Sequence, residues 1–281
     1  MKFLGKAFLV LVFIFLFIPF LFSTSFKFQF LSPEFWIASL RAGAVYPKLE
    51  KVLKNGLQMQ VKEGKTSAQE AKVFWTGVLS SGTLQDIIEK NLKLSLDFAT
   101  GRAKDRKFYI PFDKLPKGLV PAALSGTLGN EISPEQLTKL LGPQAQDSQF
   151  NNRNLARTGT NALVSWSVSL VVLLGVLLVM YLVTQGGKRL TTPGVGLILS
   201  SVLVMALSAL GTLWGRGAGQ EMLANEAEPA AQLLGTLGPP VILPMFALWR
   251  NIALGTLVLG IALLFVKKPV TLPKKASLKK K

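Results

Sequence analysis

The sequence contains no cysteine and no histidine among its 281 residues. These absences exclude disulfide bonds, thiol nucleophiles, imidazole bases and the usual ligands of zinc and haem. Walker-type phosphate loops, dinucleotide fingerprints and clusters of metal-ligating residues are also absent from the sequence. We therefore expect no catalytic, cofactor-binding or metal-binding residues, and the chain is not expected to be an enzyme.

Acidic residues are few and confined to two stretches, Glu34 to Asp147 and Glu221 to Glu228. The chain is 49% hydrophobic and carries a formal net charge of +17. This composition is too apolar for an ordinary soluble domain and is typical of a membrane protein with several spans. Many basic residues flank apolar runs, so the positive charge indicates membrane orientation and not nucleic-acid binding.

Four long apolar runs predict four transmembrane helices. They extend over Ala7–Phe22 (continuing to about Phe26), Ala162–Thr184, Gly194–Trp214 and Val241–Val266. The first run follows Lys2 and Lys6 and lacks an Ala-x-Ala site, so we interpret residues 1–25 as a signal anchor, with cleavage near Ser25 as the alternative.

Basic residues predict the orientation of these spans. Lys2 and Lys6, then Lys188 and Arg189, then seven lysines within residues 267–281 occur without any acid among them. By the positive-inside rule both termini lie in the cytoplasm. Residues 26–161 and the loop 215–240 then lie outside a multi-pass cytoplasmic membrane. A large outside region without cysteine or an Asn-x-Ser/Thr sequon favours a bacterial cell envelope over the eukaryotic secretory route.

The outside region has the pattern of several short helices. Ser32-Pro33-Glu34 is a start signal, Pro47 opens a second helix, and Ser67 with Glu70 has capping-box spacing. The strongest amphipathic segment begins at Thr83 and ends at Gly101. We expect an extended piece at Lys107–Phe112, helices at Leu115–Leu124 and Pro134–Leu141 (with Ser133 and Gln136 as its capping box), and a polar tether over residues 142–160.

The predicted fold class is therefore mostly α: a four-helix transmembrane bundle with a small helical extracytoplasmic domain inserted between spans 1 and 2. The expected organisation is a signal anchor (1–25), an extracytoplasmic helical domain (26–161), transmembrane helices 2–4 with short loops (162–266) and a basic cytoplasmic tail (267–281).

Several features have two interpretations. Arg250 either sits at the outer membrane interface or marks a functional site within the fourth span. The basic tail either binds anionic lipid or only fixes orientation. Gly211, Gly215 and Gly219 are spaced for close helix packing or belong to a flexible loop. Residues 221–240 lie on the outer membrane surface or cap the outside domain.

Two further classes of function are open. Ser23, Ser25 and Lys27 lie just after the first apolar run, where a membrane-anchored Ser/Lys hydrolase of the envelope would place its catalytic pair. Alternatively, the chain is a subunit of an oligomeric transporter or channel whose pathway the third span lines.

Three local strings carry a resemblance: Leu31-Ser32-Pro33-Glu34-Phe35, Val45-Tyr46-Pro47-Lys48-Leu49 and Leu84-Gln85-Asp86-Ile87-Ile88-Glu89. With the order of the spans, they resemble uncharacterised bacterial multi-span membrane proteins that have one large extracytoplasmic helical loop after the first span. The resemblance implies a topology and no catalytic residues. The leading hypothesis is a non-enzymatic envelope protein whose outside domain, with 19 basic and 12 acidic side chains from Thr24 to Asn161, binds an envelope protein or an anionic polymer.

Overall fold

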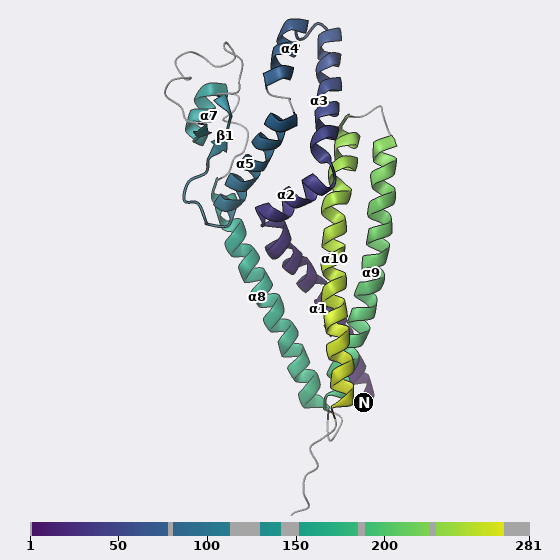
Figure 1. Cartoon of the computed structure of the whole chain (residues 1–281). Helices are drawn as coiled ribbons and strands as arrows, with labels where there is room; N and C mark the ends of the chain where they lie inside the picture. Colours follow the sequence, from purple (N-terminus) through teal and green to yellow (C-terminus); the bar gives the residue numbers. More distant parts are fainter. Residues whose placement is uncertain are drawn as a thin grey trace, which may run out of the picture. The chain divides into compact units, whose positions relative to one another are not determined.

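The computed structural model is mostly helical (Figure 1). It describes residues 2–77, 81–112, 130–141, 152–184, 189–224 and 229–266. The expected helix at Leu115–Leu124 and the basic tail, residues 267–281, lie outside the described residues. The helices and strands are α1 (Lys2–Ser25), the π-helical turn η1 (Phe26–Phe30), α2 (Pro33–Ala42), α3 (Val45–Lys62), α4 (Ala68–Gly77), α5 (Ser81–Ala99), β1 (Phe108–Tyr109), β2 (Glu131–Ile132), α7 (Pro134–Leu141), α8 (Asn152–Val183), α9 (Thr191–Ala224) and α10 (Pro229–Phe265).

Among the residues that the structure describes, four helices are long and apolar enough to cross a membrane, which confirms the expected spans. The candidate spans are Phe3–Phe30, Leu155–Val183, Thr191–Gly217 and Gly238–Phe265. Large apolar side chains on these helices remain exposed, among them Phe8, Val171 and Val258. Contact with lipid tails accounts for such exposure, because in a bilayer an apolar side chain need not be covered by protein. The protein is therefore a multi-pass membrane protein.

The expected polar tether is wrong where the structure describes it. Helix α8 begins at Asn152, so residues 152–160 continue directly into the second span. The start of this helix approaches the end of α5 closely: a Cβ built on Gly159 would lie 2.7 Å from Thr100 Cα. Helix packing therefore overrides the weak helical propensity of the Asn-rich segment.

The expected loop at residues 215–240 is also mostly helical. Helix α9 continues to Ala224 and α10 begins at Pro229. A Cβ built on Gly211 would collide with the tip of the Phe246 ring, and a Cβ at Gly215 would lie 3.3 Å from Ile242. For these two glycines the close-packing interpretation is confirmed, since their missing side chains let α9 and α10 approach each other.

The chain divides into two compact units. The first comprises residues 1–20, 169–206 and 249–281, and the second comprises residues 21–168 and 207–248.

In the first unit, α9 packs on α10 at a glycine pair, where a Cβ on Gly194 would lie 2.9 Å from Gly260 O. Hydrogen bonds join Ser201 to Thr256 (2.6 Å) and Thr184 to Thr192 (2.7 Å), so hydroxyl groups of the spans are used in helix packing.

The second unit contains the short helices, built around α5. The Ser32 hydroxyl accepts a hydrogen bond from the Phe35 amide, as the start signal of α2 predicts. Helix α3 starts two residues before Pro47, immediately after Ala44, which has a positive φ of 48°. Leu40, Val45 and Tyr46 form a buried cluster against α5. The amphipathic segment expected from Thr83 is thus the element on which α2 and α3 pack.

The extended piece is confirmed at β1, which pairs antiparallel with β2. Asn91 of α5 fixes this small sheet, because its side chain accepts from the Tyr109 amide and donates to the Tyr109 carbonyl, at 2.9 and 2.7 Å. The capping box of α7 is also confirmed: Ser133 Oγ accepts from the Gln136 amide at 3.2 Å, and Gln136 Oε1 accepts from the Ser133 amide at 2.8 Å.

Candidate functional site

A carboxylate in the second unit accepts hydrogen bonds from three different residues. Glu89 of α5 accepts from Arg41 Nε at 2.8 Å, from the Tyr46 hydroxyl at 3.0 Å and from Gln85 Nε2 at 2.9 Å. Arg41 Nη2 donates to the second Glu89 oxygen, which makes the pair bidentate. The Glu89 side chain is only 15% exposed. The network ties α2 and α3 to α5.

Glu89 is held in its charged form. The hydrogen bond from Arg41 is the main cause that lowers the Glu89 pKa below its ordinary value of 4.5, and the bonds from Gln85 and Tyr46 act in the same direction. Burial, followed by the bond to Glu89, raises the pKa of Tyr46. A carboxylate with a lowered pKa and several donors is a poor proton acceptor. Glu89 is therefore suited to holding the helices together.

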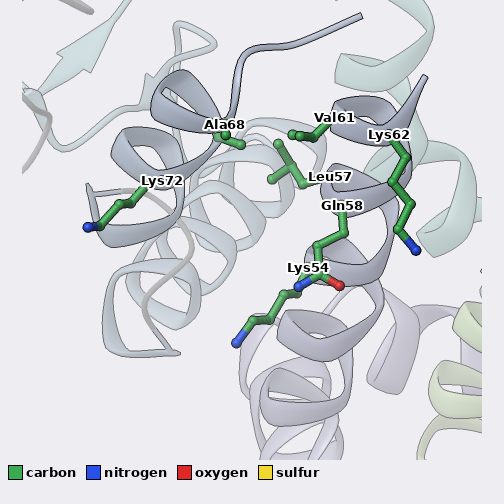
Figure 2. Close-up of a pocket in the computed structure, with 8 residues that line it drawn as sticks. Lys54, Leu57, Gln58, Val61, Lys62, Ala68 and Lys72 are labelled. Carbon is green, nitrogen blue, oxygen red and sulfur yellow. The ribbon is translucent and has the colours of Figure 1, made fainter. Parts of the chain in front are cut away.

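A groove between α3 and α4 is the first candidate binding surface (Figure 2). Its volume is about 550 Å³. Leu57 and Val61, one turn apart on α3, point toward Ala68 of α4 and form the apolar floor. The described lining residues include three lysines and no acid, and the lysines are Lys54, Lys62 and Lys72.

The three lysines lie at the edges of the groove. In Figure 2 the ammonium end of Lys72 extends away from α3, that of Lys62 extends away from α4, and that of Lys54 lies below the apolar floor. Lys54 and Lys62 are exposed on α3, and Lys72 is exposed on α4. Lysine ammonium groups are strongly hydrated point charges that suit phosphate and carboxylate groups without demanding one geometry.

A second cavity of about 690 Å³ lies among α2, the start of α3, α9 and α10 within the second unit. Phe35, Leu243 and Pro240 contribute apolar surface, and Lys48 and Arg216 contribute positive charge. Among the described residues that line this cavity, none is acidic. The helices approach closely beside it, since a Cβ on Gly43 would lie 2.7 Å from Pro240. Of the two interpretations of residues 221–240, this contact favours packing on the short helices.

Ser23, Ser25 and Lys27 occupy packing positions. Ser23 Oγ lies 3.4 Å from Ser165 Oγ of α8, and Ser25 is fully buried. The Lys27 ammonium lies 3.8 Å from the centre of the Trp166 ring. This distance is that of a cation–π contact, so the ammonium group is engaged by an aromatic ring. The geometry offers no support for the Ser/Lys hydrolase, which stays a hypothesis.

Arg250 lies on an exposed position of α10, next to buried Trp249. The helix from Asn251 to Phe265 and the following Val266 supply about 24 Å of rise below it, against a hydrocarbon core of about 30 Å. An arginine side chain can bridge the remaining distance to the interface. Because the candidate span Gly238–Phe265 also extends about 18 Å above Arg250, the rise below it does not by itself place Arg250 at the interface, and its two interpretations stay predictions.

Within residues 2–77, 81–112, 130–141, 152–184, 189–224 and 229–266, no group of three or more acidic side chains is placed to hold a metal ion. Asp105 and Asp113 flank the extended piece in the sequence; Asp105 is exposed, and Asp113 lies outside the described residues. The groove and the cavity were missed in the sequence because each joins residues of separate elements. Their only sequence signal is the excess of basic residues.

No protein-family model, no curated protein and no solved structure matches this chain. The chemistry of the groove and the cavity is therefore the basis on which a function can be proposed.

Proposed function

We propose that this multi-pass protein is a non-enzymatic component of a bacterial cell envelope that binds an anionic envelope polymer through the groove between α3 and α4. The protein is held in the cytoplasmic membrane by its four spans, with the first span as an uncleaved anchor. Both termini lie in the cytoplasm, and residues 26–161 lie outside.

The lysine-lined groove is the observation that carries this proposal. The groove has a volume of about 550 Å³ and is lined by three lysines beside its apolar floor, and the described lining contains no acid. An anionic polymer presents regularly repeated charges to such a surface, and several weak contacts along one strand add to a useful affinity. Flexible ammonium groups tolerate variation in the spacing of those charges.

The arrangement of the short helices supports a binding role. The bidentate pair of Arg41 with Glu89 holds the end of α2 against α5, and the bond from Tyr46 to Glu89 holds the first turn of α3 there. The second half of α3 carries Lys54, Lys62 and exposed Met59, and it contacts α4. Because the start of α3 is fixed on α5, the pair of helices α3 and α4 presents the groove without a large rearrangement on binding.

The sidedness of the proposal is tested by residue accessibility in the cysteine-free chain. Single cysteines at Lys90 and at Lys274 are introduced into the full-length protein and treated with a membrane-impermeant maleimide in intact cells. We expect labelling at position 90 only, because residue 274 lies in the cytoplasmic tail. Labelling of both positions, or of 274 alone, contradicts the orientation.

Polymer binding is tested on the full-length protein in detergent with poly(glycerol phosphate) as the probe. The triple variant K54Q/K62Q/K72Q should bind more weakly, and a rise in salt should weaken the wild type because exposed charges are screened beyond about 8 Å at physiological ionic strength. The matched control K51Q/K93Q/K104Q removes the same charge from the same helical unit outside the groove.

Equal losses in the two triple variants would show that only the net charge matters, and the groove would then be rejected as the site. Binding of polyglutamate in preference to poly(glycerol phosphate) would identify an acidic protein as the partner and overturn the polymer assignment.

A further inference from the structure

The cavity among α2, α3, α9 and α10 lies at the ends of two candidate membrane spans, unlike the groove between α3 and α4. Arg216 is the last residue but one of the candidate span Thr191–Gly217, and Pro239 is the second residue of the span Gly238–Phe265. The contacts of Gly211 with Phe246 and of Gly215 with Ile242 hold these two helix ends side by side. The cavity thus lies at the level where two spans end, which is the level of lipid headgroups.

The lining of this cavity combines apolar walls with positive charge. Phe35 comes from α2 and Leu243 from α10, and both are partly buried. Lys48 and Arg216 are the charged residues of the lining, and both are exposed. A small water-soluble anion would gain nothing from the apolar walls, and a zwitterionic lipid would gain less than an anionic one from the two cations because its own ammonium group opposes them.

We infer that this cavity binds one anionic phospholipid. Its phosphate group lies between Lys48 and Arg216, and the part of its acyl chains nearest the glycerol lies against Phe35 and Leu243. A guanidinium can donate two parallel hydrogen bonds to phosphate oxygens, and an ammonium adds a point charge. The cavity volume of about 690 Å³ is within the range of small-ligand sites.

The site joins parts of the chain that are far apart in sequence. The lining includes α2 and the first turn of α3 on one side, and the last turns of the span in α9 and the first turns of the span in α10 on the other. A bound lipid would therefore stabilise the contact that Gly43 makes with Pro240, because it touches both sides and binds only when they are together. This role is independent of the polymer proposal and of the orientation of the protein in the membrane.

The experiment uses the full-length protein in nanodiscs that contain phosphatidylglycerol and phosphatidylcholine in equal amounts. After transfer to mild detergent, native mass spectrometry counts the lipid that remains bound. We expect the wild type to retain one phosphatidylglycerol in clear preference to phosphatidylcholine. R216Q and K48Q should each weaken this retention about tenfold, as expected for the loss of a charge-assisted contact.

Two further variants separate the site from general charge and from folding defects. K51Q removes a lysine one turn along α3 that does not line the cavity, and it should retain lipid as the wild type does. A42F fills the cavity from α2 without changing charge and should also lose the lipid. Helical content and melting temperature of each variant, measured by circular dichroism, verify that the fold is intact.

Retention that is equal for the two lipids, or equal in wild type and R216Q, overturns the inference. A loss in K51Q as large as that in K48Q also overturns it, because the effect would then come from the membrane surface charge. Displacement of the lipid by an excess of inorganic phosphate would assign the site to a free anion and reject the lipid.

Discussion

Replacing Glu89 with alanine removes the acceptor shared by Arg41, Tyr46 and Gln85. Tyr46 is 5% exposed, so its hydroxyl loses a partner in a largely buried place. The cost of such an unpaired group is about 1–3 kcal/mol. Arg41 is well exposed, and water can replace its lost bonds. We therefore expect the contact of α2 and α3 with α5 to lose about 2 kcal/mol of stability.

Hydrogen exchange measured by mass spectrometry reports this loss locally. A change of about 2 kcal/mol corresponds to amide exchange about 30-fold faster in α2, α3 and α5. Glu89→Gln keeps one acceptor oxygen and should give a smaller increase. The double variant E89A/Y46F lacks the orphaned hydroxyl and should recover part of the loss.

The matched control is Glu63→Ala. Glu63 also pairs with a lysine, Lys65, but both side chains are more than half exposed. Its removal should leave exchange unchanged, because solvated pairs contribute little. If E89A exchanges no faster than E63A, or if Y46F gives no recovery, the Glu89 network does not stabilise the unit and the reasoning is refuted.

Two more predictions concern the charge of Glu89 and the contact between Gly159 and Thr100. The Glu89 pKa is lower in the folded protein than in the unfolded chain, so the unfolded chain binds more protons in acid. The stabilisation by charged Glu89 is therefore present above about pH 4.5 and is lost as the pH falls through the lowered pKa. We expect the melting temperature of E89A to fall less steeply in acid than that of the wild type. Gly159→Ala places a methyl group against the Thr100 backbone and should cost about 1–3 kcal/mol in thermal melts. Gly175→Ala, in open space on the same helix, should cost nothing, and equal melting of the two variants would contradict the close crossing of α5 and α8.

The spans and several helix starts were predictable because their signals are local. Apolar length identifies a span, and the Ser133 and Gln136 pair identifies the start of α7 from spacing alone. The amphipathic pattern of α5 likewise predicted which element the others pack on. These features need only the residues within a few turns of each other.

Features that depend on contacts between distant segments were not predictable. Nothing in the Asn-rich sequence before Ala162 indicates that Gly159 lies against Thr100. The strand that pairs with the Lys107–Phe112 piece lies beyond a long intervening segment. The two cations of the second cavity, Lys48 and Arg216, are brought together only by the packing of α2 and α3 on α9 and α10.

The turn between α2 and α3 contains one glycine and two positions that would favour one, a crowded position and a position with a left-handed backbone. Position 44 has the left-handed backbone (φ 48°), yet it is an alanine, and the glycine occupies position 43, where φ is an ordinary −79°. At position 43 there is no room for a methyl group beside Pro240. Exchanging the two residues would relax the torsion at 44 and wedge the helices apart at 43. The lack of space beside Pro240 therefore decides the position of the glycine in this turn, and the backbone strain at position 44 is tolerated. Ala44→Gly alone would remove that strain and should give a more stable protein.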